Sequence, residues 1–262
     1  MTLATQPRLK RVVVVTGTTS GIGNATATRL LERGWRVLGV ARRRAPIEHD
    51  NYEHVSADLG DTASLSRTVG QRIRALFADR HWDRVGLVNN AADAGLLGPI
   101  ERFDVDQLPA VLATNLVAPI WFMREVLQAT PPSTPLRIVN VSTGAAVRGF
   151  AGLGAYGSSK AGLRMAGMVL AAEIEEARTS RDETRNISVL SYEPGTVDTP
   201  MQENARTSSR ETLPSLDLFK RFAAEGTLIP PTAPAADIVA FLESDGEPLF
   251  SERRYGTAPR SA

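Results

Sequence analysis

The sequence of 262 residues contains no cysteine, only three histidines, and only three lysines among its 30 basic residues. A chain without cysteine has no disulfide, no thiolate nucleophile and no cysteine-ligated zinc or iron–sulfur site. The histidines, His49, His54 and His81, are scattered along the chain and do not have the spacing of a metal site. The sequence therefore predicts neither a redox-active thiol nor a metal centre.

A charge excess of one sign and a long apolar run are also missing. The formal net charge is +1, whereas proteins that bind nucleic acids usually show a strong basic excess or a basic stripe. The first residues, MTLATQPRLKR, lack the apolar core of a secretory signal, and no run approaches the ~18 apolar residues of a membrane helix. We expect a soluble cytoplasmic protein whose partners include neither nucleic acid nor a membrane.

The apolar residues that are present fall into short β-branched runs, each followed by a longer stretch with helical periodicity. Runs that read as continuous apolar segments and alternate with helices indicate a parallel sheet covered on both faces. The sequence therefore predicts an α/β fold, a doubly wound parallel sheet (Rossmann fold) in three α/β/α layers, forming a single domain over residues 1–262. The six predicted strands are 11–17, 35–41, 52–58, 84–91, 137–143 and 187–195.

Residues 200–232 interrupt this alternation. The segment is polar, contains four prolines and follows the sixth predicted strand. Long irregular segments in compact domains are often functional covers. We expect this segment to cover a site.

A glycine-rich turn joins the first predicted strand to the first predicted helix. In TGTTSGIG, residues 16–23, glycines stand at positions 17, 21 and 23. Such a turn lets backbone N–H groups approach a pyrophosphate at the positive end of the helix. The spacing is G-x-x-x-G-x-G, and the position in the first β-α unit favours nucleotide binding.

The second predicted strand ends in ARRRAP, which contains Arg42, Arg43 and Arg44. An NAD site usually has an acid here that binds the ribose 2′-hydroxyl, but no acid lies between Glu32 and Glu48. Guanidinium groups bind phosphate through paired hydrogen bonds. The turn therefore predicts NADP(H) as the cofactor.

Tyr156 and Lys160 lie four residues apart in GAYGSSKAGL, so on a helix their side chains share a face. A nearby ammonium group favours the phenolate form of tyrosine, whose ordinary pKa is ~10. Lysine is also a compact charge whose donors can hold ribose hydroxyls. The small residues around the pair leave room for a nicotinamide.

Five further motifs follow along the chain: ADL (57–59), NNAA (89–92), ATNLVAP (113–119), VNVSTGAA (139–146) and PGTVDT (194–199). Together with the features above, they occur in the order found in short-chain dehydrogenases/reductases. The chain resembles that family from Thr16 to about Thr199. The resemblance implies a catalytic set in which Asn115 holds a proton-relay water, Ser142 orients the carbonyl, and Tyr156 and Lys160 act together. It also implies that Tyr156 and Lys160 bind cofactor with Gly17, Thr19, Ser20, Gly21, Ile22, Gly23, Arg42, Arg43, Asp58, Leu59, Asn90, Ala91, Pro194, Gly195, Val197 and Thr199.

Within the family, the C-terminal third resembles sepiapterin reductases and the related bacterial benzil reductases. Sepiapterin reductases anchor the pterin with an acid near the C-terminus, where this chain has Gly256 and no acid beyond Glu252, which argues against a pterin substrate. Glu193 precedes Pro194 and either recognises a polar substrate group or pairs with an arginine. Phe150, Leu153 and Met201 are candidate pocket walls.

The resemblance implies an NADPH-dependent reductase of a ketone or 1,2-diketone, with a small-molecule carbonyl substrate and a homodimeric or homotetrameric assembly. Met165, Met168 and Leu170 are expected to pack a helix against the sheet or against a second subunit. Two alternatives remain: a reductase of another carbonyl class, such as 3-oxoacyl thioesters or steroids, and a non-catalytic NADP(H) sensor.

Overall fold

The computed structural model describes residues 10–78, 82–181, 184–257 and 260–261. These residues form one sheet with the strand order β3-β2-β1-β4-β5-β6-β7-β8, in which all neighbours are parallel except β7 and β8. The strands are β1 (Arg11–Thr16), β2 (Arg36–Ala41), β3 (Tyr52–Ser56), β4 (Arg84–Asn89), β5 (Leu136–Val141), β6 (Ile187–Glu193), β7 (Phe250–Arg254) and β8 (Arg260–Ser261).

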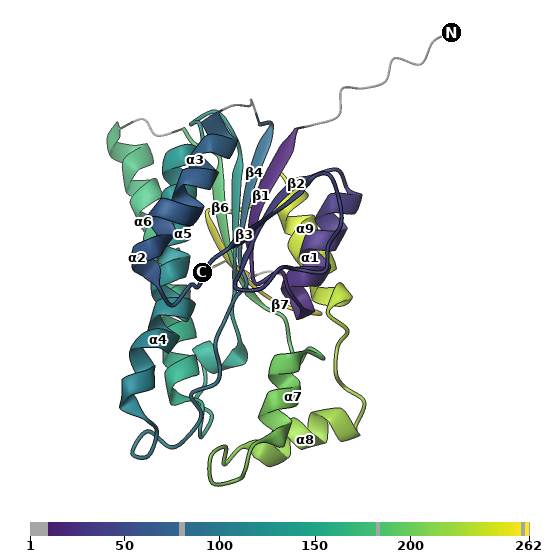
Figure 1. Cartoon of the computed structure of the whole chain (residues 1–262). Coiled ribbons are helices and arrows are strands. Elements are labelled where there is room, and N and C mark those ends of the chain that lie inside the picture. Colours follow the sequence, from purple (N-terminus) through teal and green to yellow (C-terminus); the bar gives the residue numbers. More distant parts are fainter. Residues whose placement is uncertain (1–9, 79–81, 182–183, 258–259, 262) are drawn as a thin grey trace.

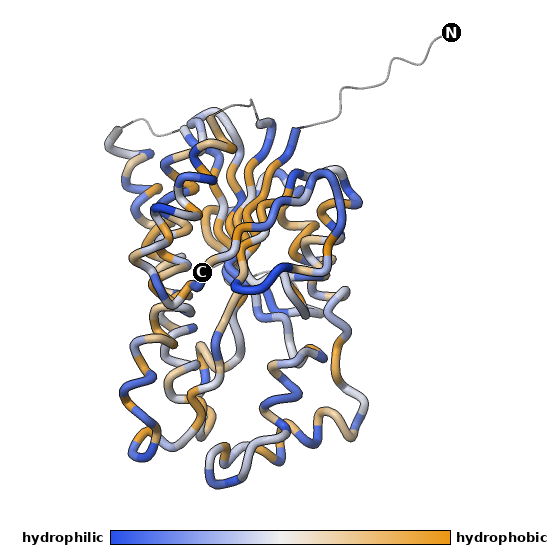
Figure 2. Tube along the Cα trace, viewed as in Figure 1, coloured by the Kyte–Doolittle hydropathy of each residue, from blue (hydrophilic) through white to orange (hydrophobic). Residues whose placement is uncertain are grey.

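The central strands are apolar because helices cover both of their faces. All six residues of β5 are buried, as are the last five residues of β1 and of β4. Figure 2 shows these strands as largely apolar, between helices that carry both hydrophilic and hydrophobic residues. The continuous runs in the sequence therefore reflect burial on both faces, as predicted.

The helices form two layers (Figure 1). On one face of the sheet lie α1 (Gly21–Glu32) and α9 (Thr232–Glu243). On the other lie α2 (Thr62–Leu65), α3 (Gln71–Ala78), α4 (Leu108–Leu112), α5 (Ala118–Ala129) and α6 (Gly154–Arg181), with the π-helical turns η1 (Ser66–Gly70) and η3 (Ala113–Val117). The short 3₁₀ turns are η2 (Val105–Gln107) and η4 (Gly144–Ala146).

The six predicted strands are confirmed, but β7 and β8 were missed. The sequence of β7, FSERR, carries three charged residues, and only its first two residues are buried. A strand near the edge of a sheet needs few apolar residues, so it lacks the continuous apolar signal that revealed the others. The tertiary pairing with β6 makes it a strand.

Residues 200–232 contain α7 (Pro200–Thr207) and α8 (Leu216–Ala224), which lie beyond the carboxyl ends of the strands (Figure 1). The two connections to the domain are joined at their base by a bridge between Val197 and Ile229. At the far end, Leu213 is fully buried, and the Ser215 hydroxyl donates a hydrogen bond to the Ala151 carbonyl at 3.0 Å. The segment therefore contacts the loop that precedes α6.

Candidate active site

The glycine-rich turn leaves the N-terminus of α1 without a cap. Ser20, the N-cap residue, makes no side-chain capping hydrogen bond, and the first turn has no acidic residue. Gly17 (φ 74°) and Gly21 (φ 56°) adopt the left-handed conformation that favours glycine. The free N–H groups of this first turn and the positive end of the helix dipole suit an anionic diphosphate.

The side chain of Asn90 holds this turn in place. Its Nδ2 donates to the carbonyls of Thr16 at 2.9 Å and Gly17 at 3.3 Å. A Cβ on Gly23 would lie only 2.3 Å from the same Nδ2 atom. The Asn90 side chain is thus occupied with the turn, and the backbone of Ala91 donates to the Thr16 hydroxyl at 3.0 Å.

The segment after β6 closes against the same turn, although about 175 residues separate the two in sequence. A Cβ on Gly21 would lie 3.0 Å from the Thr199 Cγ2 atom. Pro194 and Val197 are buried beneath this contact region, and Gly195 lies against Ile229. The structure therefore brings together the first and the last of the predicted cofactor motifs.

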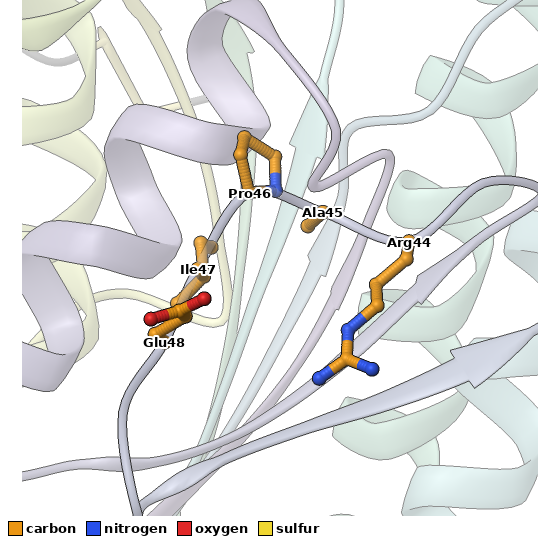
Figure 3. Close-up of a pocket in the computed structure, with 5 residues that line it drawn as sticks. All are labelled: Arg44, Ala45, Pro46, Ile47 and Glu48. Atoms are coloured by element: carbon orange, nitrogen blue, oxygen red, sulfur yellow. The ribbon is translucent and has the colours of Figure 1, made fainter.

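The three arginines after β2 are exposed, and none of them forms a salt bridge with any residue that the structure describes. The turn is fixed by the Ser56 hydroxyl, which donates to the Arg42 carbonyl at 3.0 Å. Arg44 and Glu48 belong to an open pocket along this turn, and Figure 3 shows the Arg44 side chain extending away from the backbone. Unpaired guanidinium groups at this strand end can bind a phosphate.

A polar cluster that sequence reasoning missed lies beside this turn. The Tyr52 and Thr18 hydroxyls are 2.9 Å apart, and the Tyr52 hydroxyl is 3.3 Å from Nδ1 of His54. Burial raises the pKa of Tyr52 and lowers that of His54, and the charge of Arg44 lowers both. The tyrosine ring crosses β2 at Gly39, and this glycine within an otherwise apolar strand was the available signal.

Two further residues predicted to bind the cofactor, Asp58 and Leu59, lie just after the end of β3. Asp58 is exposed, and its Oδ1 accepts a hydrogen bond from the Gly60 N–H at 2.9 Å. The Leu59 side chain is buried in the core, so only its backbone is available to a ligand. Among the described residues no group of three potential ligand side chains could hold a metal ion, and His81 lies outside them.

Lys160 connects the predicted catalytic residues. Its side chain is 1% exposed, and its Nζ donates to the carbonyl of Val141 at 2.8 Å, directly before Ser142. Ser142 is itself 8% exposed and follows the last residue of β5. Burial lowers the pKa of Lys160 to about 8.

Asn115 lies in the π-helical turn η3 and is fully buried. Its amide donates to the Asp93 carbonyl at 2.6 Å and to the Ser159 hydroxyl at 3.1 Å, and it accepts from the Asp93 N–H at 2.7 Å. Ser159 in turn donates to the Tyr156 carbonyl at 2.7 Å. The wider helical turn places the asparagine against α6, and such turns are frequent at functional sites.

Tyr156 departs from expectation in its ionisation. The sequence suggests that Lys160 favours the phenolate, but burial raises the pKa of Tyr156 to about 12. The Lys160 ammonium lies 6.0 Å from the ring centroid and donates to the Val141 carbonyl. The net shift of the Tyr156 pKa is therefore opposite in direction to the one expected from Lys160 alone.

The fold and this site define a nicotinamide-dependent oxidoreductase: an uncapped helix N-terminus, the half-buried Tyr156 and the buried Lys160 meet at the carboxyl edge of a parallel sheet. A sequence model of the short chain dehydrogenase family matches residues 11–210. The chain belongs to this family.

Two curated relatives and one solved structure illustrate the similarity. Benzil reductase ((S)-benzoin forming) of Bacillus cereus is 30% identical over 91% of this chain and 96% of its own length. Sepiapterin reductase of Meriones unguiculatus is 32% identical over 89% and 92%. A structure from Beutenbergia cavernae with NADP bound at low occupancy is 25% identical, with a TM-score of 0.69 over 89% of each chain.

Proposed function

We propose that the protein is an NADPH-dependent carbonyl reductase that converts a ketone or 1,2-diketone to an alcohol. The observation that carries this proposal is the buried Lys160, which donates to the backbone at the end of β5 directly before Ser142 and lies one helical turn from the half-buried Tyr156. NADPH, when bound, supplies a hydride. Ser142 would orient the carbonyl oxygen, and Tyr156 would donate a proton to it.

In the reductive direction, Tyr156 acts as the proton donor. Burial raises the pKa of Tyr156 to about 12, so the phenol carries the proton that a reduced carbonyl oxygen must receive. Lys160, whose pKa is lowered to about 8, is mostly charged at neutral pH and would hold the ribose. Asn115 would support proton resupply through a water.

The preference for NADPH is supported by the turn after β2. Its arginines are exposed and form no salt bridge within the described part of the chain. The uncapped N-terminus of α1 and the Gly17–Gly23 turn would hold the diphosphate. The substrate class is supported by the similarity to benzil reductase and sepiapterin reductase, and the missing C-terminal acid argues against a pterin.

The test is NADPH oxidation, with NADH in parallel, against an aromatic 1,2-diketone, sepiapterin and a 3-oxoacyl thioester. We expect diketone turnover with NADPH. Tyr156→Phe should lower kcat by about 10² to 10⁴, because the proton donor is lost. Tyr192→Phe is a matched control, since Tyr192 lies on the other face of the sheet and bonds Asp237. Cofactor binding without turnover of any carbonyl would favour an NADP(H) sensor.

One apolar surface of the molecule is a candidate subunit contact for the predicted homodimer or homotetramer. Val117, Ile120, Met165 and Val169 are 46%, 44%, 52% and 47% exposed. They belong to η3, α5 and α6, which are adjacent because Leu116 contacts Gly162. Met168 and Leu170 pack against the core instead. We infer that this apolar helix face pairs with a second copy of the chain.

A further inference from the structure

Glu193 is an acidic residue at the carboxyl end of β6, beside the serine proposed to orient the substrate carbonyl. Val141 of β5 and Tyr192 of β6 are register partners, and both belong to the core on the α1 and α9 side. Side chains alternate along a strand, so Ser142 and Glu193 face the other side, where α6 carries Tyr156. Neighbouring strands are about 4.8 Å apart, which places the two residues side by side.

The carboxylate of Glu193 is turned toward the loop that begins with Ser142. Its Oε1 atom lies 3.0 Å from the position that a Cβ on Gly144 would occupy. Ser142 itself is tied to β6, because its N–H donates to the Tyr192 carbonyl at 2.7 Å. The carboxylate therefore lies on the substrate side of the sheet edge.

This carboxylate has capacity left for a ligand. It forms an ion pair with Arg254, whose Nε lies 3.5 Å from Oε1 and whose side chain is 63% exposed. An ion pair this exposed contributes little. Within the described residues, no hydrogen bond to either carboxylate oxygen is found, and the Glu193 side chain is 26% exposed. An ionised carboxylate accepts hydrogen bonds but cannot donate them.

We propose that Glu193 selects ketones that carry a hydrogen-bond donor, a hydroxyl or an ammonium group, on the carbon next to the reacting carbonyl. This inference rests on the proposed reductase function. A donor at that position satisfies the carboxylate, whereas the second oxygen of a 1,2-diketone would face it as acceptor against acceptor. Within the proposed range of ketones and 1,2-diketones, the preferred substrate class is therefore an α-hydroxy or α-amino ketone, and a 1,2-diketone is turned over less efficiently.

The experiment compares 2-hydroxyacetophenone with 2-methoxyacetophenone, which keeps the oxygen but has no donor. The selectivity ratio is kcat/KM for the hydroxy ketone divided by kcat/KM for the methoxy ketone. Wild type is expected to give a ratio of about ten or more, the value of one charge-assisted hydrogen bond. Glu193→Gln should lower this ratio by about tenfold. The same variant should raise kcat/KM for 1-phenyl-1,2-propanedione relative to the hydroxy ketone, because the glutamine amide can donate a hydrogen bond to the second oxygen of the diketone.

Two further variants separate recognition from structure. Glu193→Asp keeps the charge with a shorter reach and should give an intermediate ratio. Arg254→Gln removes the ion pair but leaves the carboxylate, so it should retain the wild-type ratio. Equal changes in Glu193→Gln and Arg254→Gln would overturn the proposal in favour of a structural ion pair. If wild type reduces both ketones with a ratio near one, this proposal fails alone; if it reduces no ketone, the proposed function fails with it.

Discussion

Lys160 is a charged side chain in a position that water hardly reaches. It is 1% exposed, and its ammonium group donates a hydrogen bond to the Val141 carbonyl. Burial of an ammonium group costs free energy unless it is compensated. The pKa of about 8 expresses this cost, since an ordinary lysine has a pKa of 10.5.

This burial predicts an unusual pH dependence of stability. Between pH 8 and 10.5 the unfolded chain binds more protons at Lys160 than the folded protein, so the free energy of unfolding rises with pH. Urea denaturation from pH 7 to 9.5 should show wild type gaining about 2 kcal/mol relative to Lys160→Met. Lys220→Met, which changes an exposed lysine of α8, should track wild type. Parallel curves for wild type and Lys160→Met would contradict the prediction.

At the scale of single elements, the ends of strands and helices provide the binding groups. The uncapped first turn of α1, the arginine turn after β2 and the 194–199 segment after β6 all lie at the carboxyl edge of the sheet. Each is fixed by backbone or core contacts, so its functional groups remain free. The hydrogen bond between Tyr52 of β3 and Thr18 similarly fixes the glycine-rich turn.

The arginine turn can be tested separately from the rest of the site. The double variant Arg42→Ala and Arg43→Ala should raise KM for NADPH about tenfold or more, because charge-assisted hydrogen bonds to the 2′-phosphate are lost. KM for NADH should change little, since NADH has no such phosphate. Arg29→Ala, an exposed arginine on α1, serves as the control. An equal rise for both cofactors would show that the turn does not read the phosphate.

At the scale of the whole molecule, one apolar helical stretch is partly buried in the core and partly exposed. Val105–Ala129 is long and apolar enough by length and composition to cross a membrane, with a mean hydropathy of 1.3, although polar residues interrupt its apolar ones. Val111, Phe122 and Val126 within it are buried against the protein. The exposed Val117 and Ile120 of this stretch lie beside the exposed apolar residues of α6. The stretch is therefore apolar both where it faces the core and where it faces outward.

The proposed pairing of this face predicts a change in assembly. Met165→Glu should convert a dimer to monomers, because a charge would be buried without a partner at the subunit contact. Sedimentation velocity at several concentrations would measure this change. Val105→Glu, at an exposed apolar position in η2 outside the face, is the matched control. A wild-type protein that is monomeric at every concentration would contradict the proposal. A tetramer that dissociates first to dimers and then to monomers would indicate a second interface.

The fold was predictable because burial on both faces of a parallel sheet leaves continuous apolar runs, and the glycines, arginines and the tyrosine–lysine spacing are local patterns. The strand β7 was not, because its charged sequence becomes a strand only through pairing with β6. The sequence by itself determined which residue types stand at the strand ends. Only the tertiary structure decided that Glu193 lies beside Ser142, that the Asn90 side chain bonds the glycine turn, and that burial raises the pKa of Tyr156. Strand register and desolvation depend on residues far apart in the chain.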